Sequence, residues 1–94
     1  MRLSTEEINT IKTSLAELDK LAQVYLFGSR VDDYKKGGDI DLLVISKQLA
    51  KKDLAKLRWD FYERFGEQKM DIILDDGRFN TPFAKLIYPQ ALKL

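Results

Sequence analysis

The absence of cysteine is the sequence feature that most restricts how this chain can fold. With no Cys among 94 residues, neither a disulfide framework nor a Cys-ligated zinc or iron–sulfur centre can hold the structure together. A chain of this length buries roughly 60–65% of its unfolded surface, which is enough for one hydrophobic core. We therefore expect a single globular domain over residues 1–94, packed around one core.

Histidine is absent as well, and this restricts the chemistry. Without the side chain that usually titrates near neutral pH, Ser-His-Asp and Cys-His catalysis are excluded. Catalysis must then rely on carboxylates, Lys, Arg, hydroxyls, backbone amides or a metal ion on oxygen ligands. The net charge of +1 is not that of a protein held to nucleic acid by phosphate neutralisation, so nucleic acid is not the favoured partner.

The expected location is the cytoplasm. The first seven residues lack the apolar region of a secretory signal. No apolar run approaches the roughly 18 residues of a membrane span, so no contact with a membrane is expected.

Hydrophobic spacing predicts three helices. Ser4 and Glu7 form a predicted capping box, and apolar residues follow at helical spacing as far as Leu18. A second amphipathic stripe runs from Ala50 to Phe65 and ends at a glycine. A short third helix is expected over 82–88, after a capping threonine and a first-turn proline. The aromatic residues of the second helix are expected in the core: Trp59, Phe61, Tyr62 and Phe65.

Runs of β-branched and aromatic residues predict strands over 22–27, 39–46 and 69–74. A last edge strand is expected over 91–94. The resulting order, α-β-β-α-β-α-(β), predicts an α/β (α+β) protein in which helices pack on a small mixed β-sheet.

Two aspartates begin the second predicted strand. In the run Asp39-Ile40-Asp41-Leu42, side chains alternate between the faces of the strand, so Asp39 and Asp41 point the same way, about 6.6 Å apart. Asp is uncommon in strands, and a carboxylate beside an apolar core is costly unless it is paired or binds a cation. The pair is therefore either a cation site or the solvated start of a strand.

Two further features favour a site. Gly28-Ser29 directly follows the first predicted strand; glycine lets the backbone approach a phosphate, and the nearby amides and the hydroxyl can donate to it. Asp71, in the third predicted strand, joins the aspartate pair if the second and third strands are neighbours. Taken singly, Gly28-Ser29 is compatible with an ordinary turn and Asp71 with a charge at a strand edge.

Together these residues fit phosphoryl chemistry on magnesium. Mg²⁺ is usually held by one or two carboxylates plus substrate phosphates, and two ions about 3.5–4 Å apart can clamp the attacking and leaving oxygens of an in-line displacement. Asp39 and Asp41 can bridge two such ions, while Asp71 can ligate one of them or accept the proton of the incoming hydroxyl. The Gly28-Ser29 turn would hold the β- and γ-phosphates of the leaving pyrophosphate.

The combined motif resembles that of the polymerase-β-like nucleotidyltransferase superfamily. It consists of a strand that ends in Gly-Ser-Arg at residues 28–30, a spacer, Asp-x-Asp in a strand at residues 39–41, and a later strand aspartate at Asp71. In size and element order the chain is similar to the minimal nucleotidyltransferases of prokaryotes, and the resemblance covers almost all of it.

The resemblance implies a role for each matching position. Gly28-Ser29 corresponds to the triphosphate-binding turn, and Arg30 to an arginine that contacts phosphate. Asp39 and Asp41 correspond to the paired metal ligands, and Asp71 to the third carboxylate.

Two features complicate this assignment. Asp75 is an alternative third carboxylate on the same strand face; Asp71 is preferred because Asp75 falls in the turn signal Asp75-Asp76-Gly77. Many members carry a second arginine where this chain has Asp32, which leaves the substrate less certain than the metal site.

The resemblance implies a Mg²⁺-dependent enzyme that transfers a nucleoside monophosphate, AMP from ATP, to a hydroxyl and releases pyrophosphate. Because 94 residues leave no room for an acceptor-binding domain, the acceptor would be bound by a partner chain or in a homodimer. Family members suggest a helical HEPN-type toxin as that partner, with a tyrosine as the acceptor and the transferase as antitoxin. The alternative is a catalytically silent module that binds a nucleotide or the partner and neutralises it by complex formation.

Basic residues could also steer a triphosphate or RNA, although a solvated helix face explains most of them equally well. They are Lys35-Lys36 in the spacer and, around the second predicted helix, Lys47, Lys51, Lys52, Lys56 and Arg58.

Overall fold

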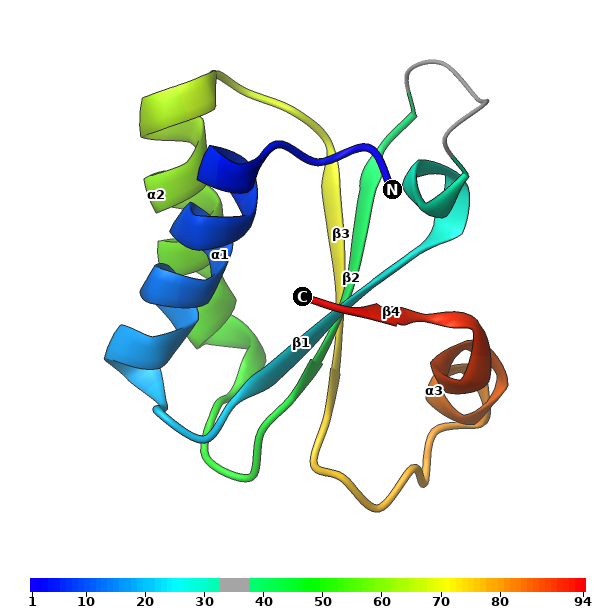
Figure 1. Ribbon diagram of the computed structural model, residues 1–94. Helices are drawn as coiled ribbons and strands as arrows, with labels where there is room; N and C mark the ends of the chain where they lie inside the picture. The colour runs from blue at the N-terminus through cyan, green and yellow to red at the C-terminus, as the bar shows by residue number, and fades with distance from the viewer. Residues whose placement is uncertain (33–37) are drawn as a thin grey trace.

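A four-stranded sheet with helices on both faces forms the centre of the protein in a computed structural model, which describes residues 1–32 and 38–94 (Figure 1). The elements follow the order predicted from the sequence. They are α1 (Thr5–Leu18), β1 (Gln23–Phe27), β2 (Ile40–Ile45), α2 (Leu54–Phe65), β3 (Met70–Asp75), α3 (Pro82–Ile87) and β4 (Leu92–Lys93), with short 3₁₀ helices η1 (Gly28–Val31), η2 (Lys51–Asp53) and η3 (Tyr88–Gln90).

The sheet is mixed, as predicted, with the strand order β3-β2-β1-β4. β1 pairs antiparallel with β2 and with β4, whereas β2 and β3 are parallel. The parallel pair needs a crossover connection, and α2 provides it. The end of β1 and the starts of β2 and β3 therefore lie at the same end of the sheet, which is the upper end in Figure 1.

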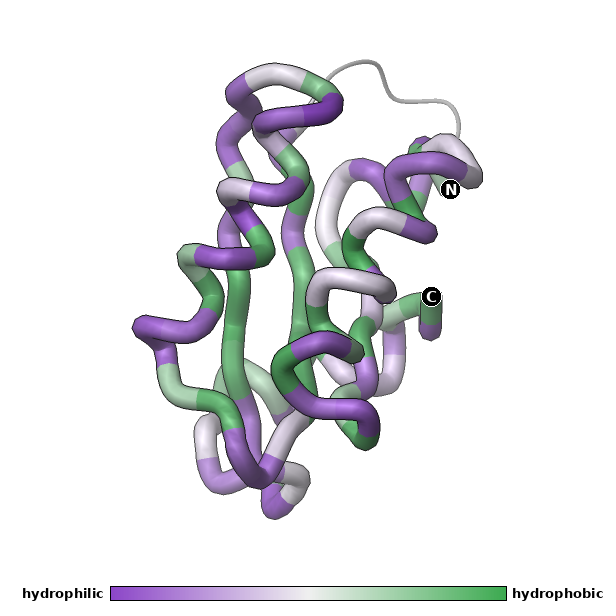
Figure 2. The backbone as a smooth tube through the Cα atoms, turned by 90° about the vertical axis from the view of Figure 1, so that its left-hand side faces the viewer, coloured by the Kyte–Doolittle hydropathy of each residue, from purple (hydrophilic) through white to green (hydrophobic). Residues whose placement is uncertain are grey.

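The hydrophobic core has one part on each face of the sheet. On one face, Leu42 of β2 and its neighbours pack against Leu57 and Phe61 of α2 and against α1; on the other, Leu43 packs with Ala84 of α3. Figure 2 shows hydrophobic stretches along the central strands and a mixture of hydrophilic and hydrophobic residues along the helices. Because both faces of β2 are covered, it carries an almost continuous apolar run and not a polar–apolar alternation.

The helix ends follow the sequence in part. The capping box of Ser4 and Glu7 is present, and Gly66, with φ of 85°, ends α2 as predicted. Thr81 precedes α3, but the predicted side-chain cap does not form. The predicted start of the second helix at Ala50 is wrong, because this exposed residue precedes η2.

The prediction that Trp59 lies in the core is also wrong. Its side chain is 65% exposed, whereas Phe61 is 1% exposed. Two residues along a helix turn the side chain by about 200°, so Trp59 points away from the side of α2 on which Leu57 and Phe61 face the sheet. Phe65, the last residue of α2, is 38% exposed, so it also lies outside the core. No helix in the described part of the chain is long and apolar enough to cross a membrane.

Candidate active site

The sheet register brings the predicted carboxylates together. β2 and β3 are neighbours, which is the condition for Asp71 to join the aspartate pair, and Asp41 pairs with Asp71 in the parallel register. Asp39 precedes β2 by one residue and is partly buried. Phe27, the last residue of β1, pairs with Asp41 from the other side. The end of the sheet thus presents three aspartates and the turn that follows β1.

The electrostatics of this cluster favour a bound cation. Burial raises the pKa of Asp41, and the charges of Asp71 and Asp39 and a hydrogen bond with Asp71 raise this pKa further, while Lys69 opposes them. The Lys69 ammonium lies 3.5 Å from an Asp39 oxygen and 4.0 Å from an Asp71 oxygen, on a side chain that is 69% exposed. An exposed lysine therefore supplies positive charge beside the carboxylates. An exposed ion pair of this kind contributes only about 0–1 kcal/mol, so another cation can replace it.

The aspartates of the cluster meet the ligand requirements of magnesium in part. Within residues 1–32 and 38–94, no group of three or more Asp, Glu, His or Cys side chains stands ready to hold a metal ion. Mg²⁺, however, needs only one or two carboxylates when phosphate oxygens and water complete its octahedron. Asp39, Asp41 and Asp71 provide hard oxygen donors, with a raised carboxylate pKa that a cation would lower. The donor set thus fits magnesium held jointly with a phosphorylated ligand.

Gly28 makes the close approach of the turn to the carboxylates possible. Its φ is 79°, and a Cβ built on it would collide with the Asp41 carboxylate. Two separate constraints, the left-handed backbone and the contact with Asp41, therefore require glycine here. η1 starts at this residue, so the turn presents helix N-terminal amides next to Asp41, with the Ser29 hydroxyl against Gly38, which is an arrangement suited to phosphate oxygens.

Gly38 plays a similar part on the other side of the turn. Its φ is 94°, and a Cβ at this position would collide with the Ser29 hydroxyl. The Gly38 carbonyl accepts hydrogen bonds from Gln68 Nε2 at 3.1 Å and from Arg30 Nε at 3.3 Å. The segment before Asp39 is thereby attached both to the turn after β1 and to the loop before β3.

Arg30, predicted as a phosphate contact, is engaged with the backbone. Besides the bond to Gly38, its Nη1 donates to the Arg2 carbonyl at 2.9 Å. Arg2 in turn donates from Nη2 to the Ser29 carbonyl at 3.0 Å. Sequence reasoning missed Arg2, and no local pattern could have found it, because 27 residues separate it from Ser29. It also missed Lys69, although period-2 alternation places this residue on the same face as Asp71.

The structure places Asp75, the alternative third carboxylate, far from this cluster. It is the last residue of β3, pairs with Ile45 and is 5% exposed. Its Oδ2 accepts hydrogen bonds from the amides of Gly77 at 2.7 Å and Phe79 at 3.2 Å. Asp75 therefore belongs to β3 and not to the turn, contrary to the prediction, and its side chain organises the connection to α3.

A hollow of about 380 Å³ adjoins the turn on the α3 side. Phe83 of α3 packs edge-on against Phe27, with ring centroids 6.0 Å apart. Leu86, on the same helix, is 67% exposed. The residues that line the hollow are mostly apolar: Phe27, Gly28, Val31, Leu86, Ile87 and Gln90. It therefore offers an apolar surface next to the predicted phosphate-binding turn.

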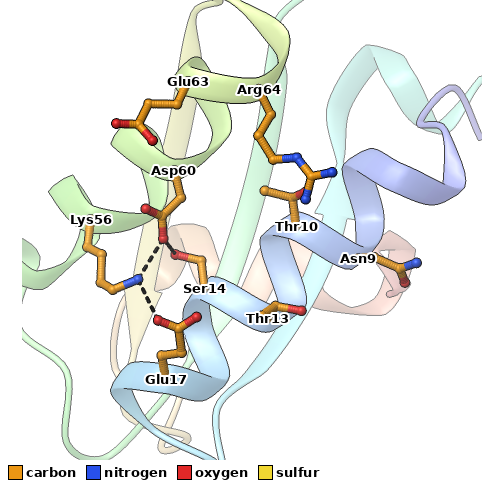
Figure 3. A pocket seen from close by; sticks show the side chains of 9 residues that line it. All are labelled: Asn9, Thr10, Thr13, Ser14, Glu17, Lys56, Asp60, Glu63 and Arg64. Atoms are coloured by element: carbon orange, nitrogen blue, oxygen red, sulfur yellow. Dashed lines mark hydrogen bonds and ion pairs between the residues drawn. The ribbon is translucent and has the colours of Figure 1, made fainter.

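A polar groove lies elsewhere, between α1 and α2 (Figure 3). There Lys56 Nζ lies 2.6 Å from Asp60 and 3.0 Å from Glu17, and Ser14 donates to Asp60 at 2.7 Å. These contacts link α1 and α2 on the face of the sheet opposite Asp39, Asp41 and Asp71. Lys47 and the lysines of η2 follow the far end of β2, so they do not surround the carboxylates. Lys35-Lys36 lie outside the described residues.

The comparison with known families agrees with this geometry. The family model of the nucleotidyltransferase domain matches residues 8–90, a span that includes Gly28-Ser29, Asp39, Asp41 and Asp71. No curated protein matches the chain significantly. With most of its length matched and a mixed sheet that presents the aspartates beside a Gly-Ser turn, the chain belongs to the nucleotidyltransferase domain family.

Proposed function

We propose that this protein is a minimal nucleotidyltransferase that moves a nucleoside monophosphate, AMP from ATP, to a hydroxyl group in a Mg²⁺-dependent reaction. One observation carries the proposal: Asp41 and Asp71 are paired in register, and the Gly28 backbone lies against Asp41 where a Cβ would not fit. Metal-ligating oxygens and a phosphate-binding turn are then close enough to act on one triphosphate.

In the proposed reaction, the turn and the aspartates have different roles. The Gly28-Ser29 amides and the Ser29 hydroxyl would hold the β- and γ-phosphates, and Asp39 and Asp41 would hold magnesium. Bound there, Mg²⁺ would offset the negative charge of the carboxylates and phosphate oxygens. Asp71 orients the incoming hydroxyl and accepts its proton. The hydroxyl oxygen bonds to the α-phosphorus, the bond from that phosphorus to the bridging oxygen breaks, and pyrophosphate leaves with the electron pair.

The nucleoside part of the substrate would lie in the apolar hollow beside Gly28. Small-molecule sites are mostly apolar concavities of about 300–1,000 Å³ with a few polar groups. The hollow has about 380 Å³, and Gln90 gives it a polar side chain at one wall. Because Gly28 belongs to both the turn and the hollow, a nucleotide could occupy the two together.

The acceptor, we propose, is a tyrosine of a HEPN-type helical toxin, and the transferase is its antitoxin. This part rests on the similarity to minimal nucleotidyltransferases, and with it we propose that the protein acts in the cytoplasm. The exposed apolar side chains near the site, Phe83 and Leu86, are compatible with a protein as the acceptor.

Labelling tests the proposal. Wild type incubated with α-labelled ATP, Mg²⁺ and the protein encoded by the neighbouring gene should transfer label to it. Asp39→Asn and Asp41→Asn should abolish the transfer and leave the fold intact by circular dichroism. Asp76→Asn is the matched control: this carboxylate is half-exposed like Asp71 but lies at the other end of β3, so its variant should label normally.

Catalysis is refuted if wild type transfers label from none of the four NTPs while the two proteins still form a complex. That result would establish the alternative, a module that neutralises its partner by binding. Dependence of the complex on MgATP would then show whether the site retains nucleotide.

A further inference from the structure

We infer that Arg2 is a positioning residue for the phosphate-binding turn, and this inference rests on the proposed function of that turn. Arg2 lies outside the span matched by the family model, residues 8–90. It reaches the turn from the segment before α1. Its role would be to hold Gly28-Ser29 in the conformation that receives the β- and γ-phosphates, without touching the reacting atoms.

The contacts of Arg2 converge on the end of η1. Its backbone N–H donates to the Arg30 carbonyl at 2.8 Å, its Nε to the Asp32 carbonyl at 2.9 Å and its Nη2 to the Ser29 carbonyl at 3.0 Å. The last carbonyls of any helix lack partners within the helix. Arg2 therefore donates to the carbonyls of two η1 residues and of the C-cap Asp32, and the Ser29 carbonyl also accepts from the Asp32 N–H at 3.2 Å.

These contacts fix the other end of η1 as well. A 3₁₀ turn of four residues is too short to be rigid by itself, so holding its carbonyl end restricts the orientation of its amide end, at Gly28-Ser29. Arg30 returns the contact through Nη1 to the Arg2 carbonyl and also donates to the Gly38 carbonyl. The N-terminal segment, η1 and the residue before Asp39 thus form one connected unit.

Arg2 is itself held in place by its neighbours. Leu3 packs against the core cluster between the sheet and the two long helices. Ser4 caps α1 and accepts from the Glu7 amide at 3.1 Å, while its own N–H donates to Glu7 at 2.8 Å. Two structurally fixed residues directly after Arg2 give its side chain a defined starting point, which reduces the entropy lost on ordering it.

The geometry needs arginine in particular. A guanidinium is planar and presents several donors in a fixed fork, and here Nε and Nη2 serve carbonyls three residues apart in sequence. A lysine ammonium would keep the charge and the backbone hydrogen bond but could not reproduce this fork. Arg2→Lys and Arg2→Gln therefore separate the shape of the side chain from its charge.

Titration calorimetry with magnesium tripolyphosphate and with MgATP tests the inference. We expect the Kd of both ligands to rise about tenfold in Arg2→Gln, the change equivalent to one hydrogen bond to a charged group, and less in Arg2→Lys. In an assay of pyrophosphate release, KM for ATP should rise by the same factor with kcat almost unchanged, because the turn binds ground state and transition state alike.

Ser14→Ala is the control for a merely structural effect. It removes a hydrogen bond between α1 and α2 on the opposite face of the sheet, so the melting temperature should fall without a change in Kd. If Arg2→Gln does not fold, Arg2→Lys provides the comparison.

The outcomes separate the two claims. If wild type binds tripolyphosphate and both Arg2 variants bind it equally well, the inference about Arg2 is overturned and the proposed function stands. If wild type binds neither ligand, the proposed function fails and the inference falls with it. A loss of kcat at unchanged KM would also overturn it, because that would be the signature of a group acting only in the transition state.

Discussion

Replacing Asp41 by Asn should make the protein more stable at neutral pH while removing its activity. Asp41 faces Asp71 directly across the parallel β2–β3 pair, and like charges on directly opposed strand positions are destabilising. Burial of Asp41 and the charges of Asp71 and Asp39 together raise its pKa. Asn keeps the shape of the side chain and removes the charge, so the repulsion between the carboxylates is lost and so is the ability to bind a metal ion.

The size of the gain follows from the geometry. Two unit charges about 4 Å apart repel by ~1 kcal/mol in a water-like dielectric and by ~4 kcal/mol in the effective dielectric near a protein surface. The Asp71 side chain is 51% exposed, and Lys69 offsets part of the repulsion, so the water-like value of about 1 kcal/mol applies. In a domain of this size, 1 kcal/mol shifts the melting temperature by about 4–8 °C.

A double-mutant cycle isolates the interaction. Urea unfolding of wild type, Asp41→Asn, Asp71→Asn and the double variant at low salt gives the coupling free energy between the two positions. Each single variant should be stabilised, and the double variant should gain less than the sum of the single gains. Glu67→Gln, at an exposed carboxylate in the loop before β3, is the control and should change stability by less than about 0.5 kcal/mol.

The pH dependence of unfolding tests whether ionised Asp41 destabilises the fold. Because the folded pKa of Asp41 is raised, its ionisation costs stability once the pH exceeds the unfolded value of about 4, and the cost is complete above the folded pKa. The advantage of Asp41→Asn should therefore be largest near pH 7 and vanish below about pH 4. Zero coupling at pH 7, or an Asp41→Asn variant less stable than wild type, would refute the charge-repulsion argument.

Three further predictions concern the turn, the helix pair and the hollow. Gly28→Ala should cost about 1–2 kcal/mol of stability, because residue 28 has a φ of 79° and an added Cβ would collide with Asp41. The variant should also bind tripolyphosphate more weakly in calorimetry. Normal binding would contradict the role of the turn. The hydrogen bonds from Lys56 and Ser14 lower the pKa of Asp60, so Asp60→Asn should lower the urea midpoint of unfolding at pH 7. This difference from wild type should disappear as the pH falls through the folded pKa of Asp60, below about 4. If the variant is still less stable than wild type at pH 2, the ion pair is not the cause. Leu86→Gln should weaken the binding of ATP but not of tripolyphosphate. Leu21→Gln, at another highly exposed position, should change the affinity for neither ligand. Equal effects of Leu86→Gln on both ligands would place the nucleoside outside the hollow.

The sequence predicted the order of the elements because each has a local signal. The period of the apolar residues separates strands from helices, and Ser4 with Glu7 and Gly66 mark helix ends. Trp59 shows the limit of this reasoning. Residue type alone predicts that an aromatic residue of an amphipathic segment lies in the core, whereas the angular position of Trp59 relative to Leu57 and Phe61 leaves it 65% exposed.

The candidate site was predictable to the extent that period-2 alternation determines it. Alternation alone puts Asp39 and Asp41 on one face of a strand. That Asp71 joins them and Asp75 does not depends on the register of β2 against β3, which no local sequence signal specifies. A shift of one residue would have turned Asp71 to the other face.

Register explains why the two carboxylates of β3 differ so strongly in environment. Asp71 and Asp75 lie on one face of a strand, four residues and about 13 Å apart. Asp75, at the end next to α3, is buried and accepts two backbone amides, so the chain already satisfies its charge. Asp71, at the other end, has the exposed Lys69 ammonium at 4.0 Å and a second carboxylate as neighbours. A carboxylate whose charge is compensated by hydrogen bonds within the fold has a structural role. A carboxylate whose charge is fully compensated only when a cation binds is available for chemistry. By this criterion we propose Asp71, and not Asp75, as the third acid of the site, and Asp75→Asn should lower the melting temperature without changing the affinity for magnesium tripolyphosphate.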